Sequence, residues 1–121
     1  MRRSILLHLI LAALASTLWS CQAPSTSAAD RVLGVERVRL PDGRHIALRC
    51  SGQGSPTVIF ETGFGGGSLG WSRVQPEVAK TTRTCSYDRA GYGLSDPGPM
   101  PRDGAAVARD LDKALNAAHI R

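Results

Sequence analysis

The residues after position 34 begin with two short segments in which apolar and polar side chains alternate. Residues 35–40 and 44–50 follow this period of two, and Pro41-Asp42-Gly43 between them has the composition of a tight turn. The pattern predicts an antiparallel hairpin. Residues 57–61 are mainly apolar, which is typical of a strand covered on both faces, as the strands of parallel sheets are.

The middle of the chain changes to a helical pattern and then back to a strand pattern. Trp71, Val74 and Val78 recur at helical spacing and predict a helix over residues 72–80, whose proline fits only the first turn or a kink. Residues 83–87 have the β-branched and aromatic content of a second buried strand.

A longer helix is expected near the end of the chain. Asp103 is a candidate N-cap, and the apolar side chains that follow at helical spacing define one face: Val107, Leu111, Leu115 and Ala118. The order of elements is therefore a hairpin followed by β-α-β-α. This order predicts an α/β fold with helices packed on a largely parallel sheet.

Size and charge limit the classes of protein to consider. The chain has 121 residues, enough for one modest domain, and a formal net charge of +5 to which Arg2 and Arg3 contribute. The other arginines are scattered without a basic run, whereas nucleic-acid binding needs positive charge gathered on one face. We therefore expect no nucleic-acid partner.

The N-terminal segment has the features of an export signal. Two arginines precede an apolar stretch over residues 5–15, which is shorter than a membrane span. Leu18-Trp19-Ser20-Cys21 follows and resembles a bacterial lipobox, from which Trp19 departs. The resemblance implies attachment of lipid to Cys21. The alternatives are ordinary cleavage after residues 27–29 with release of a soluble exported protein, or an uncleaved anchor.

These features divide the chain into three parts, and each part has an expected role. Residues 1–20 are the expected signal peptide, 21–33 a flexible tether of small and polar residues, and 34–121 a partial α/β domain. The expected location is the cell envelope, with the membrane as a partner through the lipid. Export also permits Cys50 and Cys85 to form a disulfide, although two buried thiols are an equally open interpretation.

Two glycine-rich segments resemble the α/β-hydrolase family. They are Thr62-Gly63-Phe64-Gly65-Gly66-Gly67-Ser68 after the first buried strand and Tyr87-Asp88-Arg89-Ala90-Gly91-Tyr92-Gly93-Leu94-Ser95-Asp96 after the second. The leading hairpin and Trp71 add to the likeness, which covers residues 35–121. The resemblance implies hydrolysis of an ester, amide or similar bond in a small-molecule substrate by a nucleophile, a histidine base and an acid.

The resemblance also implies roles for individual residues. The backbone N–H of Phe64 is the expected oxyanion-hole donor, supported by Gly63, while Thr62 stands where the family often has histidine. Asp88, Gly91 and Gly93 are expected to shape the second loop rather than to take part in chemistry, with Asp88 accepting hydrogen bonds from loop backbone.

The family's nucleophile is not expected within this sequence. Gly66-Gly67-Ser68-Leu69-Gly70 fits the G-x-S-x-G pattern in letters, but Ser68 lies in a long glycine loop rather than in a tight strand-to-helix turn. His119 is two residues from the chain end and poorly placed as a base. We therefore expect nucleophile, acid and histidine to follow Arg121, and the 121-residue chain to be inactive alone.

Two alternatives come from other classes of protein. In the first alternative, the chain is a lipid-anchored, non-catalytic remnant or binding module. In the second, the Gly63-Phe64-Gly65 segment belongs to a dinucleotide-binding domain, although Ser68 then stands at the position of the third glycine of that motif. No clustering of His, Cys, Asp and Glu has the spacing of metal ligands. We expect neither a metal nor a cofactor.

Overall fold

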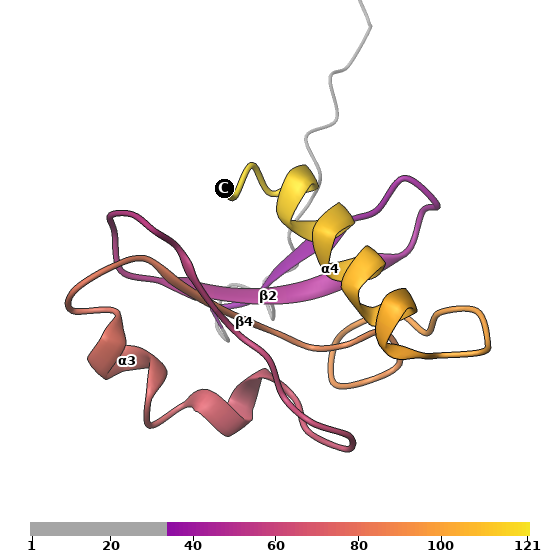
Figure 1. Cartoon of the computed structure of the whole chain (residues 1–121), viewed down its shortest axis with the longest axis horizontal. Helices are drawn as coiled ribbons and strands as arrows, with labels where there is room; N and C mark the ends of the chain where they lie inside the picture. Colours follow the sequence, from indigo (N-terminus) through magenta and orange to yellow (C-terminus); the bar gives the residue numbers. More distant parts are fainter. Residues whose placement is uncertain (1–33) are drawn as a thin grey trace, which may run out of the picture.

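The computed structural model describes residues 34–121, which form one mixed sheet with helices on both faces (Figure 1). The sheet is built from β1 (Glu36–Arg39), β2 (His45–Ser51), β3 (Val58–Phe60) and β4 (Thr84–Tyr87). The helical segments are η1, a 3-10 turn over Ser68–Trp71, α3 (Gln75–Val78) and α4 (Gly104–Ala117). The predicted order, a hairpin followed by β-α-β-α, is confirmed.

The strands lie in the order β1-β2-β4-β3. The β1/β2 hairpin is antiparallel, as its turn composition predicts, and β2 also pairs antiparallel with β4. Only β3 and β4 run parallel, so the expectation of a largely parallel sheet is wrong for these residues. The reason is that the hairpin enters the sheet beside β4, where its second strand runs against the parallel pair.

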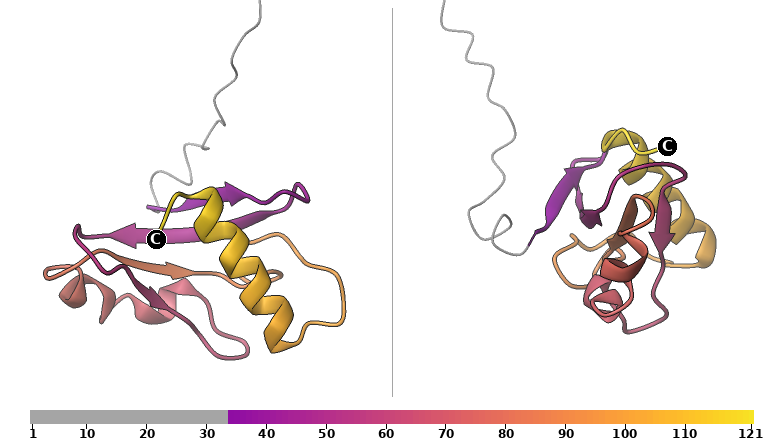
Figure 2. Two further views of the ribbon diagram at one scale, coloured as in Figure 1. Left: turned by 45° about the horizontal axis from the view of Figure 1, so that its top comes forward. Right: turned by 90° about the vertical axis from the view of Figure 1, so that its left-hand side faces the viewer.

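The helical segments cover opposite faces of the sheet. Cys85 belongs to the core against which α4 packs, and Ile59 borders that core. The next residue, Phe60, stacks instead on Trp71 of η1, with 4.9 Å between the ring centroids. Because neighbouring residues of a strand point to opposite faces, α4 lies on one face and η1 with α3 on the other. Figure 2 shows α4 crossing the sheet obliquely, away from α3.

The N-cap and most of the core-facing side of α4 are as predicted. Asp103 caps the helix by accepting a hydrogen bond from the backbone N–H of Ala106 at 2.7 Å. Leu111, Leu115 and Ala118 pack against the core. The most deeply buried helical positions, however, are Asp110 and Ala114. A buried carboxylate was not anticipated, and it is stabilised by Arg44 and Arg102, each 2.7 Å from an Asp110 oxygen.

The helix predicted over residues 72–80 is much shorter than expected, because within this range only α3, Gln75–Val78, is helical. Pro76 occupies the first turn of α3, because it has no N–H to donate within a helix and so sits where none is needed. Val74, assigned to the apolar face, is 46% exposed. Spacing alone overestimated this helix because it cannot show where a proline forces the start.

The strand over residues 57–61 differs from prediction in its surroundings. The sequence suggests a strand covered on both faces, but β3 is at the edge of the described sheet and all its residues are only partly buried. β4, in contrast, is buried throughout. The difference arises because an apolar run shows how much a strand tends to be buried, not which strands lie beside it.

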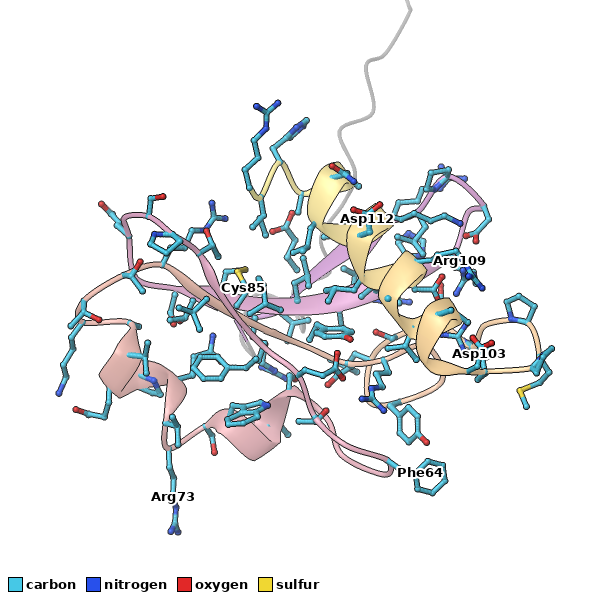
Figure 3. All side chains as sticks on the ribbon, viewed as in Figure 1. Phe64, Arg73, Cys85, Asp103, Arg109 and Asp112 are labelled. Atoms are coloured by element: carbon cyan, nitrogen blue, oxygen red, sulfur yellow. A yellow bond between two sulfur atoms is a disulfide. The ribbon has the colours of Figure 1, made fainter. Side chains whose placement is uncertain are left out.

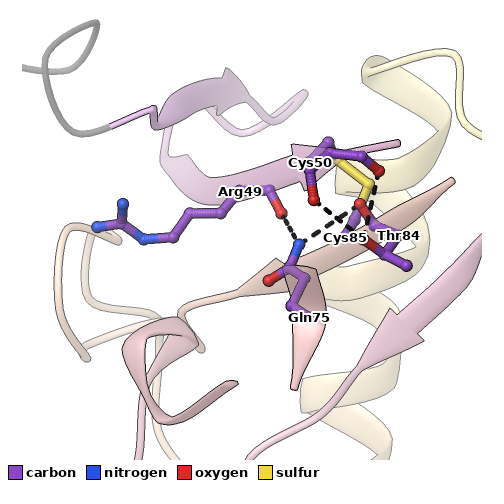
Figure 4. Close-up of a disulfide and its surroundings, with 6 residues drawn as sticks. Arg49, Cys50, Gln75, Thr84 and Cys85 are labelled. Carbon is purple, nitrogen blue, oxygen red and sulfur yellow. Dashed lines mark hydrogen bonds between the residues drawn. A yellow bond between two sulfur atoms is a disulfide. The ribbon is translucent and has the colours of Figure 1, made fainter. Parts of the chain in front are cut away.

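Cys50 and Cys85 form a disulfide that links β2 to β4 (Figure 4). The two residues are directly opposed in the antiparallel register of these strands. Next to it, Gln75 of α3 donates a hydrogen bond to the carbonyl of Arg49 at 2.8 Å. The disulfide therefore joins the hairpin to the central strand at a point where α3 also contacts the sheet.

The export signal, the tether and Cys21 lie in residues 1–33, outside the described residues. Within residues 34–121, no helix is long and apolar enough to cross a membrane.

Candidate functional site

Two loops meet at the carboxyl ends of the parallel strands. Residues 61–67 follow β3 and residues 88–95 follow β4. Since β3 and β4 are parallel neighbours, their carboxyl ends lie at the same edge of the sheet. In open α/β sheets, ligands bind in crevices at this edge. The segments that carry the family resemblance are thus brought together where chemistry is expected.

The first loop contains a tight turn with Phe64 at its tip. The N–H of Gly66 donates to the carbonyl of Gly63 at 3.1 Å, and Gly65 has a φ of +78°. A positive φ at the third position only, together with this hydrogen bond, is the geometry of a type II turn, which favours glycine there. The Phe64 side chain is 95% exposed and points away from the body of the molecule (Figure 3).

Asp88 holds the two loops together through backbone hydrogen bonds. One carboxylate oxygen accepts the N–H of Ser68 at 2.6 Å and the other accepts the N–H of Leu94 at 3.1 Å. Asp88 is 4% exposed, so both bonds form away from water, where a charged acceptor gives strong hydrogen bonds. The structure thus places Asp88 in the backbone-binding role that the sequence predicts for it.

Two glycines allow the loops to approach this carboxylate. A Cβ on Gly67 would lie 2.9 Å from an Asp88 oxygen, and one on Gly93, which has a φ of +51°, would collide with the same carboxylate. Gly91 has a φ of +86° and its N–H donates to the carbonyl of Asp96 at 3.1 Å. Gly91 and Gly93 therefore determine the path of the second loop.

Ser68 is buried and already bonded on both its backbone and its side chain. It is 3% exposed, its N–H is held by Asp88, and its hydroxyl accepts a hydrogen bond from Arg49 Nε at 2.9 Å. His119, which the sequence analysis found poorly placed as a base, is an exposed residue just after α4. A buried serine whose hydroxyl faces an arginine has no base to remove its proton, which agrees with its rejection as nucleophile.

A cavity of about 460 Å³ opens between the two loops, within the size range of small-molecule sites. Its walls are the backbone of five glycines and the side chains of Arg49, Leu69, Asp88, Tyr92 and Leu94. Gly65, Gly66 and Gly67 line it, while Phe64 and Gly63 are not among the lining residues. The Phe64 ring instead stands edge-on to Tyr92, with 6.3 Å between ring centroids.

A second cluster at the same edge was not predicted as part of the site. The Glu61 carboxylate accepts hydrogen bonds from the Tyr87 hydroxyl and, at 2.5 Å, from Arg89 Nε. Burial, followed by the hydrogen bond to Glu61, raises the pKa of Tyr87, and the same carboxylate raises the pKa of Arg89. The sequence contains a signal for this cluster, because each of its residues ends a strand or lies within two residues after one.

The geometry disagrees with a dinucleotide site. Such a site places pyrophosphate at the N-terminus of a substantial helix. Here the glycine loop leads into η1 and α3, which have four residues each. The N–H of Ser68 at the start of η1 already binds the Asp88 carboxylate. An anion from the same chain therefore occupies the position that a phosphate would need.

No family model matches the sequence. Similarity to curated proteins covers part of the chain. A probable transporter, efuK, of Hormonema carpetanum is 37% identical over 70 residues, 56% of this chain and 10% of that protein. An uncharacterized vacuolar membrane protein of Saccharomyces cerevisiae is 43% identical over 63 residues, 50% of this chain and 10% of that protein. The chain thus spans about a tenth of the length of these relatives.

Solved structures match more of the chain. A hydrolase from Pseudomonas aeruginosa has a TM-score of 0.64 and 25% identity, covering 72% of this chain and 33% of that one. An α/β-hydrolase from Sphaerobacter thermophilus has a TM-score of 0.58 and 29% identity, covering 69% and 32%. The chain spans about a third of the length of both. With the mixed sheet and its two loops, these matches show that residues 34–121 have the fold of the N-terminal part of an α/β-hydrolase.

Proposed function

We propose that this chain is the oxyanion-side part of a hydrolase-type enzyme that cleaves an ester, amide or similar bond of a small molecule. The observation that carries the proposal is the glycine loop after β3, in which Gly65, Gly66 and Gly67 line a cavity of about 460 Å³ and Phe64 is at the tip of a type II turn. Acyl transfer develops negative charge on the carbonyl oxygen, and a fixed backbone N–H stabilises that charge.

The chemistry requires groups that we do not assign to these residues. A nucleophile must attack the carbonyl carbon, and a histidine oriented by an acid must accept its proton. Ser68, the serine that fits the pattern in letters, is buried against Arg49. We infer that the 121-residue chain has no turnover by itself and that the attacking groups belong to a longer product.

We also propose that the protein is exported and carries lipid on Cys21. The charged and apolar N-terminal segment and the lipobox-like sequence support export, and the Cys50–Cys85 disulfide suits an oxidising compartment. Mass spectrometry of the mature protein tests this proposal. We expect an N-terminal Cys21 bearing acyl chains, and an unmodified N-terminus further along, for example at Asp30, would contradict it.

Two measurements separate an enzyme from a non-catalytic remnant. The first is the genomic sequence after codon 121, which we expect to encode a strand, an in-frame G-x-S-x-G segment, an acid and a histidine. The second is hydrolysis of p-nitrophenyl acetate, expected for the longer product and absent for the 121-residue chain. An authentic stop at this point would favour a lipid-anchored remnant or binding module. If the 121-residue chain hydrolyses the ester and Ser68→Ala abolishes that activity, our assignment of the site residues is wrong.

A further inference from the structure

We propose that Glu61 is the positioning residue of the glycine loop, fixing the direction of the Phe64 N–H from its place between Tyr87 and Arg89. The proposal rests on the hydrolase function for its chemical meaning. The family resemblance assigns no role to Glu61. It also leaves open which residue orients the glycine loop, because Thr62 stands where the family often has histidine.

Glu61 lies at the point where β3 becomes the loop. It follows β3 directly and precedes the Thr62-Gly63-Phe64 segment. One of its oxygens binds the hydroxyl of Tyr87, the buried last residue of β4, and the other binds Arg89 at 2.5 Å. A single carboxylate thus joins the start of the first loop to both the central strand and the start of the second loop.

The far end of the first loop is held by a different carboxylate. Asp88 accepts the N–H of Ser68, where the loop enters η1. Between the two anchors, residues 62–67 include four glycines, whose backbone has the greatest conformational freedom of any residue. The direction of the turn must therefore be imposed from its ends, by Glu61 on one side and Asp88 on the other.

Thr62 does not supply this restraint through its side chain. Its hydroxyl is buried and makes no hydrogen bond within the described part of the chain. The Glu61 contacts, in contrast, are two charge-assisted hydrogen bonds, each accepted by one oxygen from a different donor, and together they restrain the orientation of the carboxylate as well as its position.

Nitrogen-15 relaxation of the labelled 121-residue chain tests the proposal without requiring catalysis. In Glu61→Gln, the amide that replaces the carboxylate cannot accept from both donors, so the order parameter of the Phe64 N–H should fall from about 0.85 to below about 0.6. The Ser68 N–H should keep its value because Asp88 still holds it. Glu77→Gln, which removes a surface carboxylate paired with Lys80, is the matched control and should change neither.

A spectroscopic signature shows whether the contact has been lost. The hydrogen bond to Glu61 contributes to the raised pKa of Tyr87, so the phenol of Tyr87 should titrate at lower pH in Glu61→Gln. An unchanged Phe64 order parameter in a variant whose Tyr87 titration has moved would overturn the proposal. If Glu61→Gln does not fold, Tyr87→Phe removes one of the two donors to Glu61, and an unchanged Phe64 order parameter in that variant would likewise overturn the proposal.

Catalysis supplies a further, separate readout. In a longer product that hydrolyses p-nitrophenyl acetate, Glu61→Gln should lower kcat at least tenfold with little change in KM, because a misdirected donor affects the transition state more than substrate binding. Failure of the hydrolase proposal would appear as absence of turnover in the parent protein. Failure of the positioning proposal would appear as unchanged Phe64 dynamics, so the two are distinguishable.

Discussion

The carboxylate of Asp88 accepts the backbone N–H groups of Ser68 and Leu94, one on each oxygen, in a space kept open by Gly67 and Gly93. Its position at a strand end before a glycine pair was sufficient to predict a backbone-binding role. The partner across the sheet edge was not predictable, because Ser68 is 20 residues away along the chain. For the same reason the contacts of Glu61 with Tyr87 and Arg89 were not predicted.

Asp88→Asn tests the role of the Asp88 carboxylate in stability. An asparagine has one acceptor oxygen, so one of the two backbone donors would face an NH2 group in a buried position. We expect the free energy of unfolding to fall by about 1–3 kcal/mol. Urea denaturation followed by circular dichroism measures it, with Asp112→Asn on the exposed side of α4 as the control. Equal midpoints for the two variants would show that the two loops do not depend on this anchor.

Asp110 gives a prediction about pH. Hydrogen bonds from Arg44 and then Arg102, opposed by burial, hold the pKa of this carboxyl below its ordinary value of 3.8. A depressed folded-state pKa contributes stability that is present above the unfolded value and is lost as pH falls through the folded value. Urea midpoints should therefore drop below about pH 4 more steeply for the parent than for Asp110→Asn. Parallel pH profiles for the two proteins would refute this assignment.

At the scale of elements, the sequence predicted each strand and the last helix but not their neighbours. Period-two alternation and turn composition identify the β1/β2 hairpin because both are local properties. The edge position of β3 and its partial burial depend on which strand lies beside it, which no single segment encodes. The helix over residues 72–80 was overestimated for a partly local reason, because Pro76 fits only the first turn and α3 therefore begins no earlier than Gln75.

The cap of α4 can be removed without disturbing the core. Asp103 accepts the Ala106 N–H at 2.7 Å at an exposed helix end. Asp103→Ala should cost about 1 kcal/mol, since N-cap truncations usually cost 0.5–2 kcal/mol. Thermal unfolding checks this value against Asp112→Ala, which changes a mid-helix position on the same element. A loss no larger than that of the control would mean that the cap contributes nothing.

The disulfide is the other element-scale constraint. It connects residues separated by 35 positions, and closing a loop of that length should contribute about 4 kcal/mol. Replacing both cysteines with alanine removes the link without leaving a thiol. We expect a large drop in the urea midpoint, reproduced in the parent by a reducing agent. A midpoint insensitive to reduction would show that the strand pairing of β2 and β4 is sufficient alone.

At the scale of the whole molecule, the two loops lie on either side of one cavity only because β3 and β4 are parallel neighbours. The resemblance of their sequences indicated this arrangement, and the structural neighbours agree with it over about 70% of the chain. The cavity between the loops was not predictable, since Arg49 and Leu69 reach it from other elements. These features leave the Phe64 N–H as the group on which the proposed chemistry depends.

The most direct test compares Phe64→Pro with Phe64→Ala in the longer product that carries the attacking groups. Proline suits the second position of a type II turn but has no N–H, whereas alanine keeps it. We predict that kcat for p-nitrophenyl acetate falls by about 10²–10³ with proline, the usual effect of losing one oxyanion donor, and little with alanine. Equal rates for the two variants would contradict the assignment of the glycine loop as the charge-stabilising half of the site.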